Sequence, residues 1–273
     1  MSTSSAYEPY CGNPPVPGQL LDSWNLDPVL LTILACVAAL YAMGASRTRN
    51  VTRRERAAFW IGWSVATAAL VSPLCSLSVA LFSARVGQHM VLTVVAVPLL
   101  ILGGVGQIIS EVTSGKGVLW PAIRAFIKAV GNWPIGLVSF AAFLWLWHVP
   151  VLYDSTLRSN TAYWIMHLSL FGSALLLWRE LLQTGAERRL IGFGTGFLTS
   201  LHMGSLGALL TFAPSSIYTS HQVTTWPWGL SALADQQLGG LIMWVPGCTV
   251  FIMAGLFSMA AVLRNTEGEC KLF

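Results

Sequence analysis

Long uninterrupted blocks of apolar residues recur along the whole chain and constrain its fold more than any other feature of the sequence. Each block has about 17 to 25 residues, the length of α-helix that crosses a hydrocarbon layer at about 1.5 Å per residue. Charged residues make up only 10% of the 273 residues, whereas an ordinary soluble domain has about 25%. Because a soluble core cannot hold so much apolar surface, the sequence predicts a membrane protein built of helices.

The apolar blocks predict an all-α, polytopic bundle of about seven transmembrane helices. The predicted spans cover residues 28–45, 57–74, 87–104, 134–150, 161–182, 190–212 and 236–263. No polar stretch of the sequence is long enough to form a second, soluble domain. We therefore expect a polar outer N-terminal tail over residues 1–27, a single transmembrane domain over 28–263, and a cytoplasmic tail over 264–273.

The positions of the basic residues predict how this bundle is oriented across the membrane, because lysine and arginine accumulate in the cytoplasmic loops of membrane proteins. Thirteen of the 15 basic residues fall after predicted spans one, three, five and seven or, in the case of Arg179, in the last turn of span five: Arg47, Arg49, Arg53, Arg54, Arg56, Lys116, Arg124, Lys128, Arg179, Arg188, Arg189, Arg264 and Lys271. Only Arg85 and Arg158 fall on the other side. This distribution predicts an outer N-terminus and a cytoplasmic C-terminus. Residues 118–130 of the third loop are expected to form an amphipathic helix on the cytoplasmic surface.

The cysteines and glycines are informative mainly about packing. The five cysteines, Cys11, Cys36, Cys75, Cys248 and Cys270, show no CxxC spacing. The sequence therefore indicates neither a disulfide framework nor a zinc site, and for most of the cysteines we expect packing as small apolar side chains.

Glycines are dense in the last two predicted spans, so these spans are expected to pack closely and to lie centrally in the bundle. In the last span, one small and polar stripe predicts a face turned toward protein or a cavity: Gln236, Gly240, Met243 and Gly247.

All five histidines fall on the half of the bundle that is predicted to face away from the cytoplasm: His89, His148, His167, His202 and His221. A histidine inside a membrane segment is energetically costly and is therefore a candidate for function. The alternative is a histidine that only stabilises the bundle by bonding a neighbouring helix. For the set, a functional role is the favoured interpretation. His202 lies deeper than the others, and His221 is expected to be a loop residue.

Three of these histidines have a methionine beside them in the sequence, in the pairs His89–Met90, Met166–His167 and His202–Met203. Imidazole and thioether groups together suit Cu(I), which prefers soft sulfur and nitrogen ligands. Adjacent residues of a helix point about 100° apart, however, so a pair need not converge on one ion. The predicted metal ligands are His89, His148, His167 and His202, with Met90, Met166, Met203 and Met243 as auxiliary ligands.

Further polar and aromatic residues are predicted on the same side and could support this site: Gln88, Trp147, Tyr153, Asp154, Asp235, Gln236 and Gln237. Asp235 could equally cap its own helix, because aspartate at a helix N-terminus accepts bonds from free amide groups. The sequence has no nucleophile elbow, no phosphate-binding glycine loop and no HExxH motif. We therefore expect no enzymatic activity.

Several blocks of the sequence resemble the CtaG family of bacterial cytochrome c oxidase assembly factors. The resemblance rests on Gln88-His89-Met90, on residues 97–103, on Trp147-His148-Val149-Pro150 with Tyr153-Asp154, and on Asp235-Gln236-Gln237-Leu238-Gly239-Gly240 with the following residues to Gly247. It implies a seven-helix protein of the bacterial inner membrane, linked to copper insertion, with oxidase subunits, other copper chaperones and membrane lipid as partners and no nucleic acid. The family pattern has a further His and Met one turn before the Gln-His pair, where this chain has Arg85 and Val86.

The leading hypothesis is thus a non-enzymatic factor for oxidase assembly that binds or relays Cu(I) on the outer side. A second hypothesis makes the same histidines axial ligands of a b-type haem. A third is a transporter of copper or a small solute, which would need polar groups through the cytoplasmic half, and that half is apolar. The fourth is a metal-free scaffold that holds an oxidase subunit while its cofactors are inserted.

Overall fold

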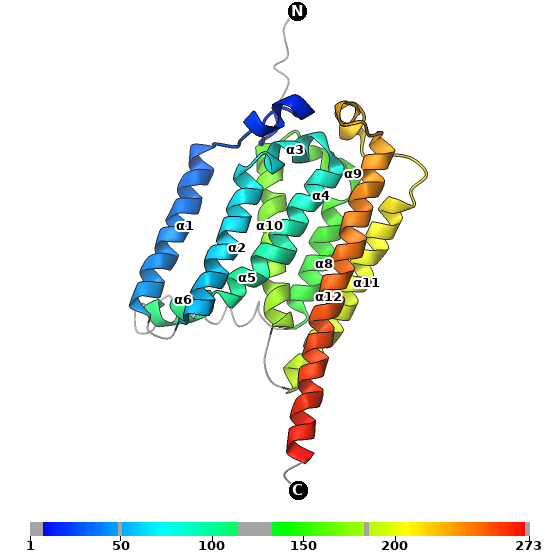
Figure 1. The fold of residues 1–273 in the computed structure, drawn as a ribbon. Coiled ribbons are helices and arrows are strands. Elements are labelled where there is room, and N and C mark those ends of the chain that lie inside the picture. Colours follow the sequence, from blue (N-terminus) through cyan, green and yellow to red (C-terminus); the bar gives the residue numbers. More distant parts are fainter. Residues whose placement is uncertain (1–7, 49–50, 114–132, 183–185, 271–273) are drawn as a thin grey trace, which may run out of the picture.

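The computed structural model describes residues 8–48, 51–113, 133–182 and 186–270, and its regular structure there is helical, without any strand (Figure 1). Helices occupy all the predicted span segments: α1 (Pro28–Arg47), α2 (Arg53–Val71), the run of α4 (Phe82–Met90), η2 (Val91–Ala96) and α5 (Val97–Leu102), α8 (Ile135–Trp147), α10 (Asn160–Leu181), α11 (Ala186–Thr211) and α12 (Ala232–Cys270). They lie side by side in one bundle (Figure 1). The all-α prediction is confirmed.

Shorter elements gather at the two ends of the bundle. At the end that we call the N-terminal face lie η1 (Pro17–Asp22), α3 (Leu74–Ala80), α9 (Pro150–Ser155), η3 (Thr219–His221) and η4 (Trp226–Trp228) (Figure 1). At the opposite end, the basic face, lies α6 (Val105–Thr113). The amphipathic helix that we predicted over residues 118–130 lies outside the described residues.

Within the described part of the chain, four helices are long and apolar enough to cross a membrane: α1, the run Phe82–Leu102, α10, and residues Ala232–Leu263 of α12. A fifth crossing is possible if α2 and α3, which meet at an angle of 47°, form one span. In contrast, α8 has only 13 residues. A total of seven crossings therefore stays a prediction. Helix α12 continues to Cys270, so the tail predicted over 264–273 begins within that helix.

Local hydrogen bonds set where two of the helices begin. Helix α2 starts with a capping box in which the Thr52 hydroxyl accepts a bond from the Glu55 amide (3.2 Å) and the Glu55 carboxylate accepts one from the Thr52 amide (2.7 Å). Helix α1 starts at Pro28, and the carboxylate of Asp27 accepts a bond from the Val29 amide (2.9 Å). Because these groups satisfy amides that have no partner within the helix, the helix starts are stabilised.

The run from α4 to α5 contains a π-helical segment, η2. Pro98 lies at the start of α5 and has no N–H, so it cannot donate to the carbonyl group one turn earlier, and the ladder of backbone bonds has to shift. Such π-helical segments are frequent at functional sites. This one directly follows His89 and Met90.

Two buried carboxylates cap helices other than their own. Asp235 of α12 accepts bonds from the backbone amides of Phe82 (2.6 Å) and Ser83 (3.1 Å), the first residues of α4. Glu180 of α10 accepts a bond from the amide of Gly136 at the start of α8 (2.7 Å). An uncapped helix start would be costly away from water. Asp235 does act as a cap, as one interpretation of the sequence proposed, but the helix that it caps is α4.

Glycines bring α11 and α12 into close contact. A Cβ atom added to Gly207 would lie 2.7 Å from Cβ of Trp244, and a Cβ atom added to Gly240 would lie 2.8 Å from the carbonyl oxygen of Gly207. A Cβ atom added to Gly196 would lie 2.6 Å from the carbonyl oxygen of Phe251. The predicted close packing is confirmed. The predicted central position is wrong, because α11 and α12 lie at the side of the bundle opposite to α1 (Figure 1).

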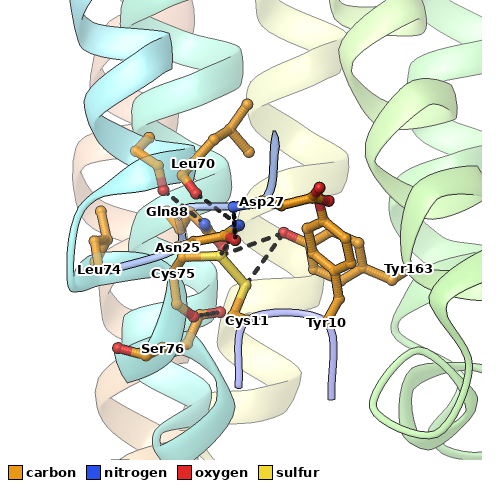
Figure 2. Close-up of a disulfide and its surroundings, with 12 residues drawn as sticks. Tyr10, Cys11, Asn25, Asp27, Leu70, Leu74, Cys75, Ser76, Gln88 and Tyr163 are labelled. Carbon is orange, nitrogen blue, oxygen red and sulfur yellow. Dashed lines mark hydrogen bonds between the residues drawn. A yellow bond between two sulfur atoms is a disulfide. The ribbon is translucent and has the colours of Figure 1, made fainter. Parts of the chain in front are cut away.

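A disulfide joins Cys11 of the N-terminal segment to Cys75 of α3, with 5.4 Å between the two Cα atoms (Figure 2). The expectation of no disulfide is therefore wrong. The two cysteines are 64 residues apart, so no local sequence motif predicts that they pair. Only the tertiary fold brings them together. Cys36 and Cys248 are free.

Removing this disulfide is expected to destabilise the protein. A double Cys11→Ser and Cys75→Ser variant should lose about 2–4 kcal/mol of unfolding free energy, because the crosslink restricts the unfolded chain over a long loop. The measurement is the thermal unfolding midpoint of the purified protein. Cys36→Ser is the matched control, since Cys36 is exposed and free. Equal midpoints for the double variant and the control would contradict the prediction.

Candidate metal site

The half of the bundle near the N-terminal face holds a cavity of about 40 Å³ between α4, α8, α10, α11 and α12. Its walls include Phe82, Arg85, Val86, His89, Met90, Thr93, Phe140, Leu144, Trp147, His148, Tyr153, Met166, Leu170, Met203 and Met243. Six of the predicted metal ligands are among them: His89, His148, Met90, Met166, Met203 and Met243. The fold thus gathers residues that are up to 154 positions apart in the sequence, from Met243 back to His89.

The two histidines of the cavity offer nitrogen lone pairs. Nδ1 of His148 lies 2.7 Å from the carbonyl oxygen of Leu144. A carbonyl group can only accept, so Nδ1 carries the proton in the neutral ring and Nε2 keeps a free lone pair. Nε2 of His89 is buried and has no hydrogen-bond partner. Both rings are therefore able to act as ligands through Nε2.

The methionines reach the cavity because α12 leaves room for them. Met166, Met203 and Met243 are buried. At Gly247 of α12, a Cβ atom would lie 2.7 Å from Cε of Met203 and 3.1 Å from Cε of Met90. The predicted stripe of α12 does face protein, and its last glycine gives the space into which two thioether side chains extend.

His167 and His202 lie outside the cavity although their methionine neighbours line it. Nδ1 of His167 donates to the Tyr163 carbonyl (3.0 Å), and its ring lies against that of His89, with 4.8 Å between the ring centroids. His202 borders an open groove between α8 and α11, and both of its ring nitrogens are buried without a hydrogen-bond partner. The cause is the angle of about 100° between adjacent residues of a helix. In these two pairs the methionine lines the cavity and the histidine does not, although His167 is itself buried and its Nε2 has no hydrogen-bond partner.

Two of the predicted supporting residues also line the cavity. The indole N–H of Trp147 donates to the Ser169 hydroxyl (2.9 Å), and the Tyr153 hydroxyl lies 2.7 Å from Nε2 of His221. Gln88 lies on another face of α4, toward the disulfide, where its amide donates to the Ala69 carbonyl (2.8 Å; Figure 2).

The remaining predicted supporting residues anchor the segment between α11 and α12. Asp154 accepts a bond from the Thr219 hydroxyl (2.8 Å), and the side chain of Gln236 accepts one from the Ile217 amide (2.6 Å). The amide of Gln237 lies 3.5 Å from the Ala213 carbonyl oxygen. With Asp235 as the cap of α4, these residues hold the N-terminal face together and do not line the cavity.

His221 takes part in this region in a way that the sequence did not reveal. It is buried, and its Nδ1 donates to the Ala80 carbonyl (3.2 Å) while its Nε2 accepts from the Tyr153 hydroxyl. Burial, together with the charge of Arg85, lowers the pKa of His221 to about 4, and burial raises the pKa of Tyr153. His221 thus holds a wall residue of the cavity in place as a neutral ring. Nothing in the local sequence distinguishes it from an exposed loop histidine.

The donor atoms around the cavity match one class of metal ion. They are imidazole nitrogen and thioether sulfur, which favour Cu(I) over hard cations such as Mg²⁺ or Ca²⁺. Within the described ranges, no group of three or more His, Cys, Asp or Glu side chains could hold a metal ion. A site here would therefore depend on the methionines.

Comparison with known proteins places the chain in a family. It is 27% identical over 252 residues to the uncharacterized proteins Mb0105 of Mycobacterium bovis and MT0111 of Mycobacterium tuberculosis, which covers 85% of this chain and 38% of each relative. No solved structure matches the chain. The sequence profile of the cytochrome c oxidase caa3 assembly factors matches residues 39–265, which include the whole cavity. This chain therefore belongs to the cytochrome c oxidase caa3 assembly factor family, Caa3_CtaG.

Proposed function

We propose that this chain is a non-enzymatic factor that binds Cu(I) in the cavity and passes it to an oxidase subunit during assembly. One observation carries the proposal: two imidazoles and four thioethers from five helices line one cavity of about 40 Å³. That volume exceeds the roughly 10–15 Å³ that one water molecule needs, so a single ion fits. The soft donor atoms explain why the ion would be Cu(I).

In this proposal the bundle crosses the bacterial inner membrane seven times, with the N-terminal face outside. The asymmetric distribution of basic residues supports this orientation. The Cys11–Cys75 disulfide supports it independently, because it lies at the N-terminal face and disulfides persist in oxidising compartments such as the periplasm. The cavity, which lies in the half of the bundle near the N-terminal face, would then lie on the outer side of the membrane.

The alternatives are less well supported by the geometry. A haem would need a cavity in the range of organic ligand sites, roughly 300–1,000 Å³, whereas the space between His89 and His148 belongs to a cavity of about 40 Å³. A metal-free scaffold would not need thioethers from several helices in the walls of one cavity.

The test is complementation of a deletion strain of the source bacterium. Wild-type protein is expected to restore cytochrome c oxidase activity and the copper content of the purified oxidase, whereas the His89→Ala and His148→Ala double variant is expected to restore neither. His202→Ala, outside the cavity, is the matched control and should behave as wild type. Full restoration by the double variant, at equal protein levels and in copper-depleted medium, would reject the copper role and leave the scaffold.

A further inference from the structure

The cavity contains a buried cation in addition to its soft donor atoms. Arg85 lies on α4 one turn before His89, and only 2% of its surface is exposed. Its guanidinium group stays charged under all ordinary conditions. Burying a charge without an opposite charge costs several kcal/mol, so the surroundings of Arg85 need an explanation.

The described residues that contact the guanidinium are neutral. One terminal nitrogen donates to the Thr156 hydroxyl (2.6 Å) and lies 3.9 Å from the Met166 sulfur, and the group lies over the Tyr153 ring, 5.0 Å from its centroid. Its Nε has no hydrogen-bond partner. In the part of the chain that the structure describes, no carboxylate forms an ion pair with Arg85.

The acidic residues of this region are already engaged. Asp235 accepts three bonds at the start of α4, from two amides and the Ser83 hydroxyl, and Asp154 accepts bonds from Thr219 and Ser220. Neither is among the residues that line the cavity. Among the described residues, Arg85 therefore has no counter-charge in direct contact with it.

We propose that the cavity binds one small monovalent anion, of the halide class, at the Arg85 guanidinium. The guanidinium supplies the charge and an unused N–H donor, and a cavity of about 40 Å³ has room for a halide or formate but not for a large organic anion. The remaining walls combine aromatic, thioether and imidazole groups with Thr93 and the aliphatic side chains of Val86, Leu144 and Leu170, and the aromatic and thioether groups suit a polarisable anion. The site exists in metal-free protein, so the proposal does not depend on copper binding.

The experiment uses the purified, metal-free full chain in detergent. Its thermal unfolding midpoint is measured while sodium chloride replaces sodium gluconate at constant ionic strength, because gluconate is too large for the cavity. Binding to the folded state alone raises the midpoint, and we expect a rise of about 2–4 °C. Arg85→Met should abolish the chloride dependence, and Arg158→Met, which alters an exposed arginine, should retain it.

A second measurement keeps the proposal testable if Arg85→Met does not fold. Crystals of the metal-free wild-type protein grown in bromide should show an anomalous peak beside Arg85. A wild-type midpoint that is the same in chloride and gluconate, or a cavity without bromide, would overturn the proposal. Because no copper is present in either measurement, these outcomes are independent of whether the chain binds Cu(I).

Discussion

Anaerobic titration of the purified protein with Cu(I) is expected to show tight binding that the combined substitutions His89→Ala and His148→Ala weaken by more than about 100-fold. Loss of a residue that only supports a ligand already costs about 10–100-fold in metal affinity, and these two rings are the imidazoles that line the cavity. Met203→Leu, which keeps the volume but removes the sulfur, should cost about 10-fold, because a thioether is the weaker ligand. Competition with a chromogenic Cu(I) chelator gives the affinities.

The matched control for this titration is His202→Ala. It removes an imidazole from the same half of the bundle, but from a groove outside the cavity, so the Cu(I) affinity should not change. The His167→Ala variant tests whether His167 is a ligand or only positions His89. His167 contacts the His89 ring but does not line the cavity, so we expect its removal to lower the Cu(I) affinity less than the double substitution does. Equal losses for His202→Ala and the double variant would contradict the assignment of the site.

The sequence predicted the helices well because hydrophobic length is a local property. Each apolar block is long enough to specify a helix by itself, and all of the predicted segments are helical. The number of crossings is harder to predict, because a helix as short as α8, with 13 residues, can be buried by its neighbours or can reach across only a thinned bilayer.

Only some of the residues that line the cavity could be predicted from the sequence, because tertiary packing decides how each helix is rotated about its axis and therefore which side chains face the cavity. His89 and Met90 both line the cavity, whereas Met166 lines it without His167 and Met203 without His202. No sequence rule for a single helix decides which neighbour points inward. The disulfide and the role of His221 were missed for the same reason, because each joins segments that are far apart in the chain.

Asp235→Ala is expected to be the most destabilising single substitution on the N-terminal face, with a loss of about 2–4 kcal/mol in unfolding free energy. The substitution leaves two buried amides and the Ser83 hydroxyl without their acceptor, and each unsatisfied buried donor costs about 1–3 kcal/mol. Asp235→Asn keeps an acceptor oxygen and should lose less. The thermal unfolding midpoint in detergent measures the effect.

The same substitution tests how the site is held in place. The start of α4 depends on Asp235, and the same helix carries Arg85 and His89 into the cavity. Asp235→Ala should therefore weaken Cu(I) binding even under conditions where the protein remains folded. Asp154→Ala is the control, because it removes a carboxylate that binds two hydroxyl groups of a loop and should cost less than about 1 kcal/mol. Equal midpoints and equal Cu(I) affinities for the two alanine variants would show that the cap of α4 is not what positions these residues.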